Sequence, residues 1–367
     1  TSCSQPAAPP APRNIVLVVV DTLRADHTGL GGYERDTTPF LDTLAAAEGS
    51  AVFTRALSSA PWTKPSVASI LTGLDPRAHG VTQHHERLHS ANLTLAEHLA
   101  AAGYQTAGFQ TNMLLASAFG YDQGFEVWGE EHLATHATST GDAVNSAAER
   151  WLATERDPER PFFLYVHHYE PHFDYLESGE RWYPDYPGPL TGGEAMDELV
   201  GAKDKLRAEE LRFLESRYDA EILLQDRMLG DLWDALAASD AASDTLFVVT
   251  ADHGEEFMDH GDLSHEFKLF EELVHVPLLV HDPRGPSAPL AGLAPGELAV
   301  PVSLTDLPRS LLGLLDPAAL DPAAARAFPG TSFLAKGSEG TVRRGPLLGH
   351  VTYQDAERAI KDLKMAD

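Results

Sequence analysis

The sequence NIVLVVVD, residues 14–21, decides the fold of this chain. Its apolar, β-branched run predicts a strand buried on both faces, as in parallel sheets. The run ends at Asp21, and the carboxyl ends of parallel strands are where open α/β sheets hold ligands. A second run, TLFVVT at 245–250, ends shortly before Asp252 and His253. The two strand ends therefore predict one site at one edge of a doubly wound sheet.

Strand-like and helix-like segments alternate along the rest of the chain. The patterns predict further strands at 51–57, 104–109, 162–166 and 276–280, and helices at 93–102, 142–156 and 206–239. This alternation indicates an α/β protein with a large central, mostly parallel sheet and helices on both faces. Residues 174–204 are rich in Pro, Gly, Tyr and acidic residues without a clear period. We expect them to form a long loop or insertion that shapes a substrate pocket.

The charge balance limits the partners of the protein. The chain has 367 residues, of which 27 are basic and 55 acidic, giving a formal net charge of −28. Such an acidic surface argues against a nucleic-acid partner or binding to anionic lipid through a basic face. An anionic small substrate stays compatible with this balance, because a site can be locally cationic.

The first residues, TSCSQPAAPPAPR, contain the single cysteine of the chain, Cys3. One cysteine forms no intrachain disulfide. Small residues before Cys3 and a Pro/Ala-rich stretch after it are typical of a bacterial lipoprotein, so we expect residues 1–13 to be a lipoprotein-derived tether. The alternative is an unrelated cysteine near an arbitrary chain start. We expect a membrane contact only through a lipid anchor at Cys3, and a periplasmic or extracellular location at the bacterial cell envelope.

The stretch APWTKPSVASILTG, residues 60–73, predicts a helix with a hydroxyl at its start. Pro65 is suited to the first helical position, because its missing N–H would be unpaired there anyway. Thr63 then lies just before the helix, where free N–H groups and the helix dipole favour an anion. The alternative reading is that Thr63 only caps the helix.

Residues 252–265, which follow the second predicted strand, contain many aspartates, glutamates and histidines, the residue types that bind metal ions. Asp252 and His253 are followed within a few residues by further acids and histidines, namely Glu255, Glu256, Asp259, His260 and His265. Carboxylates with a neutral imidazole are typical ligands of zinc or manganese, whereas calcium prefers oxygen alone. Taken singly, each residue has an ordinary structural explanation. Together with Asp21 and Thr63, they favour a metal-dependent site.

Several motifs, in order along the chain, resemble one known family. They are NIVLVVVDTLRADH (14–27), APWTKPSVASILTG (60–73), GYQTAGFQTN (103–112), LYVHHYEPH (164–172) and TADHGEEFMDHG (250–261). The chain is similar over most of its length to the sulfatase family of the alkaline phosphatase superfamily. The resemblance implies an alkaline phosphatase/sulfatase-like fold with a catalytic domain at 14–335 and a short C-terminal appendage at 336–367.

The family pattern, carried over position by position, implies one divalent metal ion. Its ligands would be Asp21, Thr63, Asp252 and His253, and Thr63 would also be the nucleophile. Zinc or manganese is favoured over calcium. The pattern implies catalytic roles for His172, which matches the Pro-His element, and for His265.

Three further residues are candidates for substrate binding. Thr111 and Asn112 fall near the segment in which the family places a substrate-binding Lys/His pair, although the letters differ. Lys268 lies three residues after His265 and would offset the charge of an anionic ester. A structural or solvated role for this lysine is the alternative.

The chain departs from the usual sulfatase pattern at the nucleophile. Most sulfatases carry Cys or Ser there, which is oxidised to formylglycine, followed by an Arg at the position of Val67 here. Thr63 is no known source of formylglycine, so none is expected. The usual second Asp of an Asp-Asp pair is Thr22, and the usual Asp-Asn pair is Asp252-His253. The pattern is closer to a branch with a Thr nucleophile that acts on phosphoesters.

We therefore predict a metal-dependent hydrolase of phosphate or sulfate esters, with phosphoesters favoured, that acts through Thr63 and a covalent intermediate. A sulfuric ester hydrolase proper and a phosphoethanolamine-type transferase are alternatives. An inactive glycan-binding lipoprotein is a third alternative, from a different functional class. It fits less well because a binding module needs no nucleophile.

Overall fold

The computed structural model describes residues 14–130, 141–266, 268–285, 296–314, 328 and 332–334. The predicted tether with Cys3 and the predicted C-terminal appendage at 336–367 lie outside these residues. In the described part of the chain, no helix is long and apolar enough to cross a membrane.

The central sheet has eight strands and is built around β1 (Asn14–Val20), as the sequence predicts. The strand order is β12-β2-β11-β7-β1-β6-β4-β5. The other bounds are β12 (Gly296–Leu298), β2 (Ser50–Phe53), β11 (Leu278–His281), β7 (Thr245–Ala251), β6 (Phe162–His168), β4 (Gln105–Gln110) and β5 (Val127–Gly129). β11 is antiparallel to both of its neighbours, and the other pairings in this sheet are parallel. The prediction of a mostly parallel sheet is confirmed.

The register of β1 brings three segments to one edge of the sheet. Val20 pairs with His168 of β6 on one side and with Ala251 of β7 on the other. All seven residues of β1 are buried, because helices cover both faces of the sheet. The first residues after β1, β6 and β7 therefore meet at the carboxyl edge.

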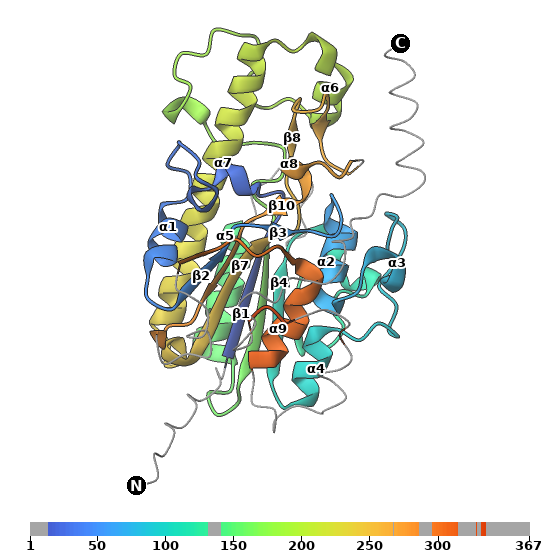
Figure 1. Cartoon of the computed structure of the whole chain (residues 1–367), viewed down its shortest axis with the longest axis vertical. Coiled ribbons are helices and arrows are strands. Elements are labelled where there is room, and N and C mark those ends of the chain that lie inside the picture. The colour runs from blue at the N-terminus through green and yellow to red at the C-terminus, as the bar shows by residue number, and fades with distance from the viewer. Residues whose placement is uncertain are drawn as a thin grey trace.

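Helices lie on both faces of the sheet (Figure 1). One face carries α1 (Pro39–Ala46), α5 (Gly141–Arg150) and the long α7 (Ala208–Ala237). The other carries α2 (Thr63–Thr72), α4 (Leu95–Ala101) and α9 (Leu307–Leu314), while α3 (Pro76–His79) follows α2. The periodic apolar face predicted for 206–239 is the buried side of α7, including Leu214, Tyr218, Ile222, Leu229, Leu232 and Leu236.

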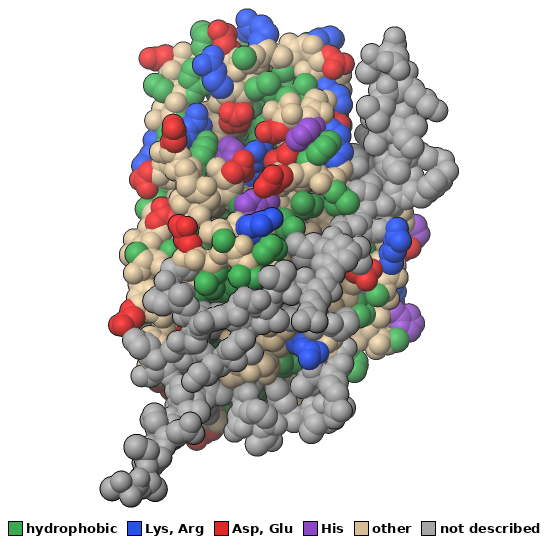
Figure 2. Space-filling view, viewed as in Figure 1, with side chains coloured by type: hydrophobic (Ala, Val, Ile, Leu, Met, Phe, Trp, Pro, Cys, Tyr) green, Lys and Arg blue, Asp and Glu red, His purple; other side chains and the backbone are tan. Residues whose placement is uncertain are grey.

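A smaller layer lies beyond the carboxyl edge of the sheet, around the upper end of α7 (Figure 1). It contains the predicted insertion at 174–204, which forms a short helix, α6 (Met196–Gly201), and 3-10 turns at Gly179–Arg181 and Lys203–Lys205. β8 (Glu256–Phe257) pairs with β9 (Leu263–Ser264), and α8 (Glu271–Val274) follows. A second small sheet joins β10 (His275–Val276), β3 (Ala56–Leu57) and β13 (Val302–Ser303). Acidic and basic side chains intermingle over this upper region (Figure 2).

Candidate active site

Asp21 is the first residue after β1 and lies fully buried at the carboxyl edge. Its backbone N–H donates to the carbonyl of His168 at 3.0 Å, which continues the sheet pairing by one residue. Its carboxylate accepts from Nδ2 of Asn112 at 2.8 Å and lies 3.4 Å from Nε2 of His167. Burial alone raises the pKa of Asp21, but the nearby histidines, His172 first, together hold it well below its usual range. These histidines therefore favour the ionised carboxylate.

Asp252 follows β7 and is oriented by backbone N–H groups. Its Oδ1 accepts from the N–H of His253 at 2.8 Å and from the N–H of Thr22 at 3.2 Å. Thr22 has φ of 57°, an uncommon left-handed conformation for a β-branched residue, within the turn after β1. Asp252 Oδ2 is buried without a hydrogen-bond partner among the described residues. Burial, reinforced by Asp21, raises the pKa of Asp252.

His253 directs its Nε2 toward the carboxylates of Asp21 and Asp252. Its Nδ1 lies 2.8 Å from the carbonyl oxygen of Gly254, which fixes the ring. Its Nε2 lies 3.4 Å from Asp21 Oδ1 and 3.6 Å from Asp252 Oδ2. Burial lowers the pKa of His253 well below its usual value. A neutral imidazole with a directed Nε2 is the form that binds metal ions.

Thr63 completes this group from the start of α2. Its Oγ1 lies 3.4 Å from each carboxylate oxygen of Asp21 and 3.3 Å from Nε2 of His253. In the structure, α2 begins at Thr63 and Trp62 is its N-cap. The helix therefore begins two residues before Pro65, the residue at which the sequence predicts its start. Thr63 is thus not the N-cap of α2, and its hydroxyl lies toward Asp21 and His253.

These residues fit a divalent cation. One donor atom from each of Asp21, Asp252 and His253 lies within 4.8 Å of the others. Among the described residues, Oδ2 of Asp252 accepts no hydrogen bond, and burying such an oxygen without a partner is costly, so a cation would stabilise it. Two carboxylates, a hydroxyl and an imidazole form a mixed oxygen and nitrogen donor set. Such a set suits zinc or manganese better than calcium.

The two predicted catalytic histidines lie beside this group. The ring centroid of His265 is 4.5 Å from that of His253 and 5.2 Å from that of His172. Nδ1 of His265 is 3.0 Å from Oε1 of the buried Glu255. Burial lowers the pKa of His172. Burial also acts to lower the pKa of His265, but the nearby carboxylates, Glu255 first, together raise it. His265 is thus the more readily protonated of the two histidines.

The predicted substrate-binding residues lie at different places. Thr111 and Asn112 directly follow β4 and are buried, and Asn112 contacts Asp21 as described above. Lys268 instead lies 3.1 Å from Glu256 and 3.5 Å from Asp262. Its charge is thus shared with two carboxylates. A substrate-binding role stays a prediction for all three residues.

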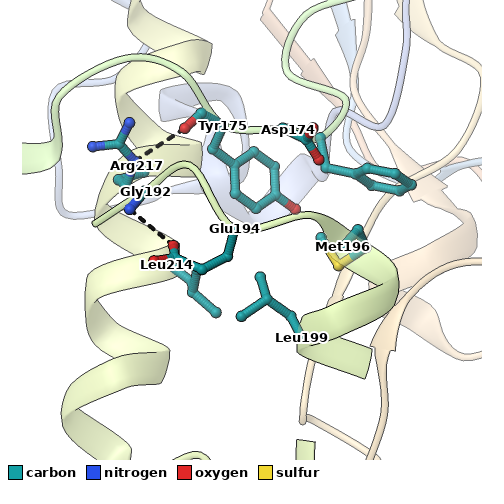
Figure 3. A pocket seen from close by; sticks show the side chains of 9 residues that line it. Asp174, Tyr175, Gly192, Glu194, Met196, Leu199, Leu214 and Arg217 are labelled. Carbon is teal, nitrogen blue, oxygen red and sulfur yellow. Dashed lines mark hydrogen bonds between the residues drawn. The ribbon is translucent and has the colours of Figure 1, made fainter. Parts of the chain in front are cut away.

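A small pocket lies between the 174–204 segment and α7 (Figure 3). Tyr175 enters it from the start of that segment, and Met196 and Leu199 of α6 face it from below. Phe173, Leu214 and Arg217 also line it. Phe173 connects the pocket to the site, because its ring centroid is 4.2 Å from that of His172.

A family model described as Sulfatase matches residues 13–317. The chain belongs to the sulfatase family. It is 26% identical over 333 residues to an arylsulfatase of Clostridium perfringens, covering 74% of this chain and 68% of that protein. The chain spans about two thirds of the length of the curated relatives that it matches.

Solved structures show the same fold. The phosphonate monoester hydrolase of Agrobacterium radiobacter superposes with a TM-score of 0.65 at 24% identity, covering 82% of this chain and 73% of that one. The C-terminal periplasmic domain of EcEptC from Escherichia coli, in complex with Zn, gives 0.60 at 21% identity and covers 88% and 91%. The predicted fold class and membership in a family of ester hydrolases are confirmed.

Two further residues contact the candidate site, although their sequence positions assign them no individual role. His167 contacts Asp21, and Glu255 contacts His265. The His167 signal was present as a histidine pair directly after the predicted strand at 162–166, which the structure extends to His168. Glu255 was one acid among several after β7, and its spacing alone does not single it out.

Proposed function

We propose that this sulfatase-family protein hydrolyses phosphate or sulfate esters with Thr63 as the nucleophile, and that phosphoesters are its favoured substrates. The observation that carries the proposal is the position of the Thr63 hydroxyl, 3.3 Å from His253 Nε2 and 3.4 Å from both oxygens of Asp21. A threonine serving only the helix would direct its hydroxyl to backbone N–H groups.

In this proposal, Thr63 Oγ1 forms a bond to phosphorus while the bond from phosphorus to the alcohol oxygen breaks. The proton of the hydroxyl leaves toward the Asp21 carboxylate, both of whose oxygens lie 3.4 Å from Oγ1, and the departing alcohol oxygen takes a proton from His172 or His265. Water then cleaves the phosphothreonine and restores the hydroxyl. N–H groups at the start of α2 favour the negative charge of the ester.

Asp21, Thr63, Asp252 and His253 would hold the divalent cation. When bound, such a cation lowers the pKa of a coordinated hydroxyl and offsets charge on the ester oxygens. Zinc or manganese is our expectation, supported by the mixed donor set and by the zinc complex of the EcEptC domain.

The preference for phosphoesters rests on Thr63. The formylglycine of most sulfatases releases sulfate by collapse to an aldehyde, a route closed to a threonine ester because its carbon carries no second hydroxyl. The phosphonate monoester hydrolase with the same fold agrees with this preference. A sulfuric ester hydrolase proper is the second candidate, favoured by the likeness to an arylsulfatase.

We propose that the 174–204 segment binds the alcohol part of the ester and so determines substrate specificity. Phe173 links its pocket to His172, and the apolar side chains of Met196 and Leu199 suit a non-polar group. The boundaries 14–335 and 336–367, the envelope location and the lipid anchor at Cys3 stay predictions of the sequence.

The test is a side-by-side assay of the purified protein on 4-nitrophenyl phosphate, bis(4-nitrophenyl) phosphate and 4-nitrophenyl sulfate, with its metals identified by mass spectrometry. Zinc or manganese with faster phosphoester turnover is the expected result. Calcium with a preference for the sulfate ester would overturn the phosphoester proposal in favour of the second candidate.

A further inference from the structure

A buried carboxylate connects the predicted insertion to His265. Glu255 is fully buried, and both of its oxygens are engaged. Oε1 lies 3.0 Å from Nδ1 of His265, and Oε2 accepts from the hydroxyl of Tyr175 at 3.2 Å. Tyr175 belongs to the 174–204 segment, which is 80 positions away from Glu255 in the sequence. The contact is therefore made only in the folded chain.

The hydroxyl of Tyr175 is held in place from several sides. Its ring packs edge-on against Tyr218 of α7 at 5.7 Å between centroids and lies 5.8 Å from Phe257 of β8. Its carbonyl oxygen accepts from Nε of Arg217 at 3.0 Å, as Figure 3 shows. Tyr175 is 4% exposed, so water has little access to replace this hydroxyl. A fixed donor on one oxygen leaves Glu255 little freedom to rotate away from His265.

We infer that Tyr175 and Glu255 are positioning residues that fix the orientation and tautomer of His265. Because Glu255 accepts from Nδ1, the ring hydrogen resides on Nδ1. Nε2 then carries the free lone pair of the ring, which packs beside His253 and His172. The insertion that shapes the pocket thereby also sets the geometry of a catalytic histidine. This inference rests on the proposed role of His265 in ester cleavage.

The kinetic test compares Tyr175→Phe and Glu255→Gln with the wild type on aryl phosphates of increasing leaving-group pKa, from 4-nitrophenyl to phenyl phosphate. Tyr175→Phe should lower kcat roughly threefold to tenfold, with KM within about twofold. The loss should grow as the leaving group becomes poorer, because a poor leaving group depends most on a well-placed imidazole. Glu255→Gln should lose more.

A double variant and a matched control separate positioning from packing. Tyr175→Phe should add nothing in the Glu255→Gln background, because Tyr175 acts through Glu255. Tyr33→Phe removes a similar hydroxyl, 2.9 Å from the buried Asp219, and should leave the kinetics unchanged. A Tyr175→Phe enzyme with wild-type kinetics, or with one uniform loss for all leaving groups together with a lowered Tm, would overturn the inference.

A second readout is independent of turnover. Nitrogen-15 NMR of the histidine rings, with His265 assigned through His265→Gln, should show the hydrogen on Nδ1 in the wild type. Glu255→Gln should shift hydrogen toward Nε2. A wild-type ring protonated only on Nε2 contradicts the inference even if the esters are cleaved. Absence of all esterase activity with the Nδ1 form intact would instead refute the proposed function and leave the positioning supported.

Discussion

The hydroxyl of Thr63 lies 3.3 Å from Nε2 of His253, although 190 positions separate the two residues in the sequence. The helix start of α2 and the turn after β7 meet there, at the carboxyl edge of the sheet. We therefore expect Thr63→Ala to lower kcat by roughly 10³-fold or more while the fold and the bound metal are retained. Metal content, circular dichroism and kcat would be measured on the same preparation.

Thr72→Ala is the matched control for this change. Thr72 lies at the other end of α2, where its hydroxyl donates to the carbonyl of Ala68 at 2.6 Å. It should affect Tm but not kcat. If Thr63→Ala turns over esters at the wild-type rate, Thr63 is not the nucleophile.

Removal of the metal should inactivate and destabilise the protein. Without a cation, Asp21 and Asp252 keep two buried carboxyl groups close together, and Oδ2 of Asp252 has no partner among the described residues. We expect chelation to abolish turnover and to lower stability by about 2 kcal/mol or more. Zinc or manganese should restore both activity and Tm, and calcium should restore them less. Full activity in the chelated protein would contradict the metal-dependent site.

Asn112 should affect metal affinity more than stability. Its Nδ2 donates to Asp21 Oδ2 at 2.8 Å and so fixes the carboxylate. We expect Asn112→Ala to weaken metal binding roughly 10-fold to 100-fold, as for other groups that orient metal ligands. Titration of the chelated protein with zinc or manganese measures the effect.

Asn92→Ala is the comparison variant, because Asn92 donates at the same 2.8 Å, but to the carbonyl of His79. Equal metal affinities of the two variants would show that Asn112 does not orient a ligand.

Glu221 of α7 should make stability fall as the pH rises toward neutrality. Burial raises the pKa of Glu221 to about 7. Its Oε1 accepts hydrogen bonds from the N–H groups of Glu177 and Leu176, which lower the pKa but do not offset burial. An unfolded glutamate titrates near ~4.3, so the folded state binds more protons between the two values. Stability contributed by the neutral acid is present at low pH and is lost as the pH rises through about 7.

Glu221→Gln should remove this dependence. We expect the variant to be more stable than the wild type above neutral pH, by up to about 3 kcal/mol, and similar near pH ~4. Thermal unfolding at several pH values measures it, with Asp231→Asn, an exposed acid of the same helix, as the control. Parallel pH profiles of the wild type and Glu221→Gln would refute the assignment.

The sequence by itself determined the sheet and the centre of the site. The β-branched runs that became β1 and β7 are typical of strands buried on both faces of a sheet, and Asp21 and Asp252 follow directly after these two strands. Asp21, Asp252 and His253 were thus predicted from strand ends alone. The apolar period of residues 206–239 likewise predicted α7, because a helix must bury one face.

Only the tertiary structure decided which side chains surround Asp21, Asp252 and His253. Asn112 reaches Asp21 across 91 positions, and His167 reaches it across 146. Tyr175, Glu255 and His265 likewise meet through an insertion without a sequence period. Periodicity tells which face of an element a residue occupies, but not its partner. The partner depends on strand register and on how loops pack over the sheet edge, and both are set by the folded chain as a whole.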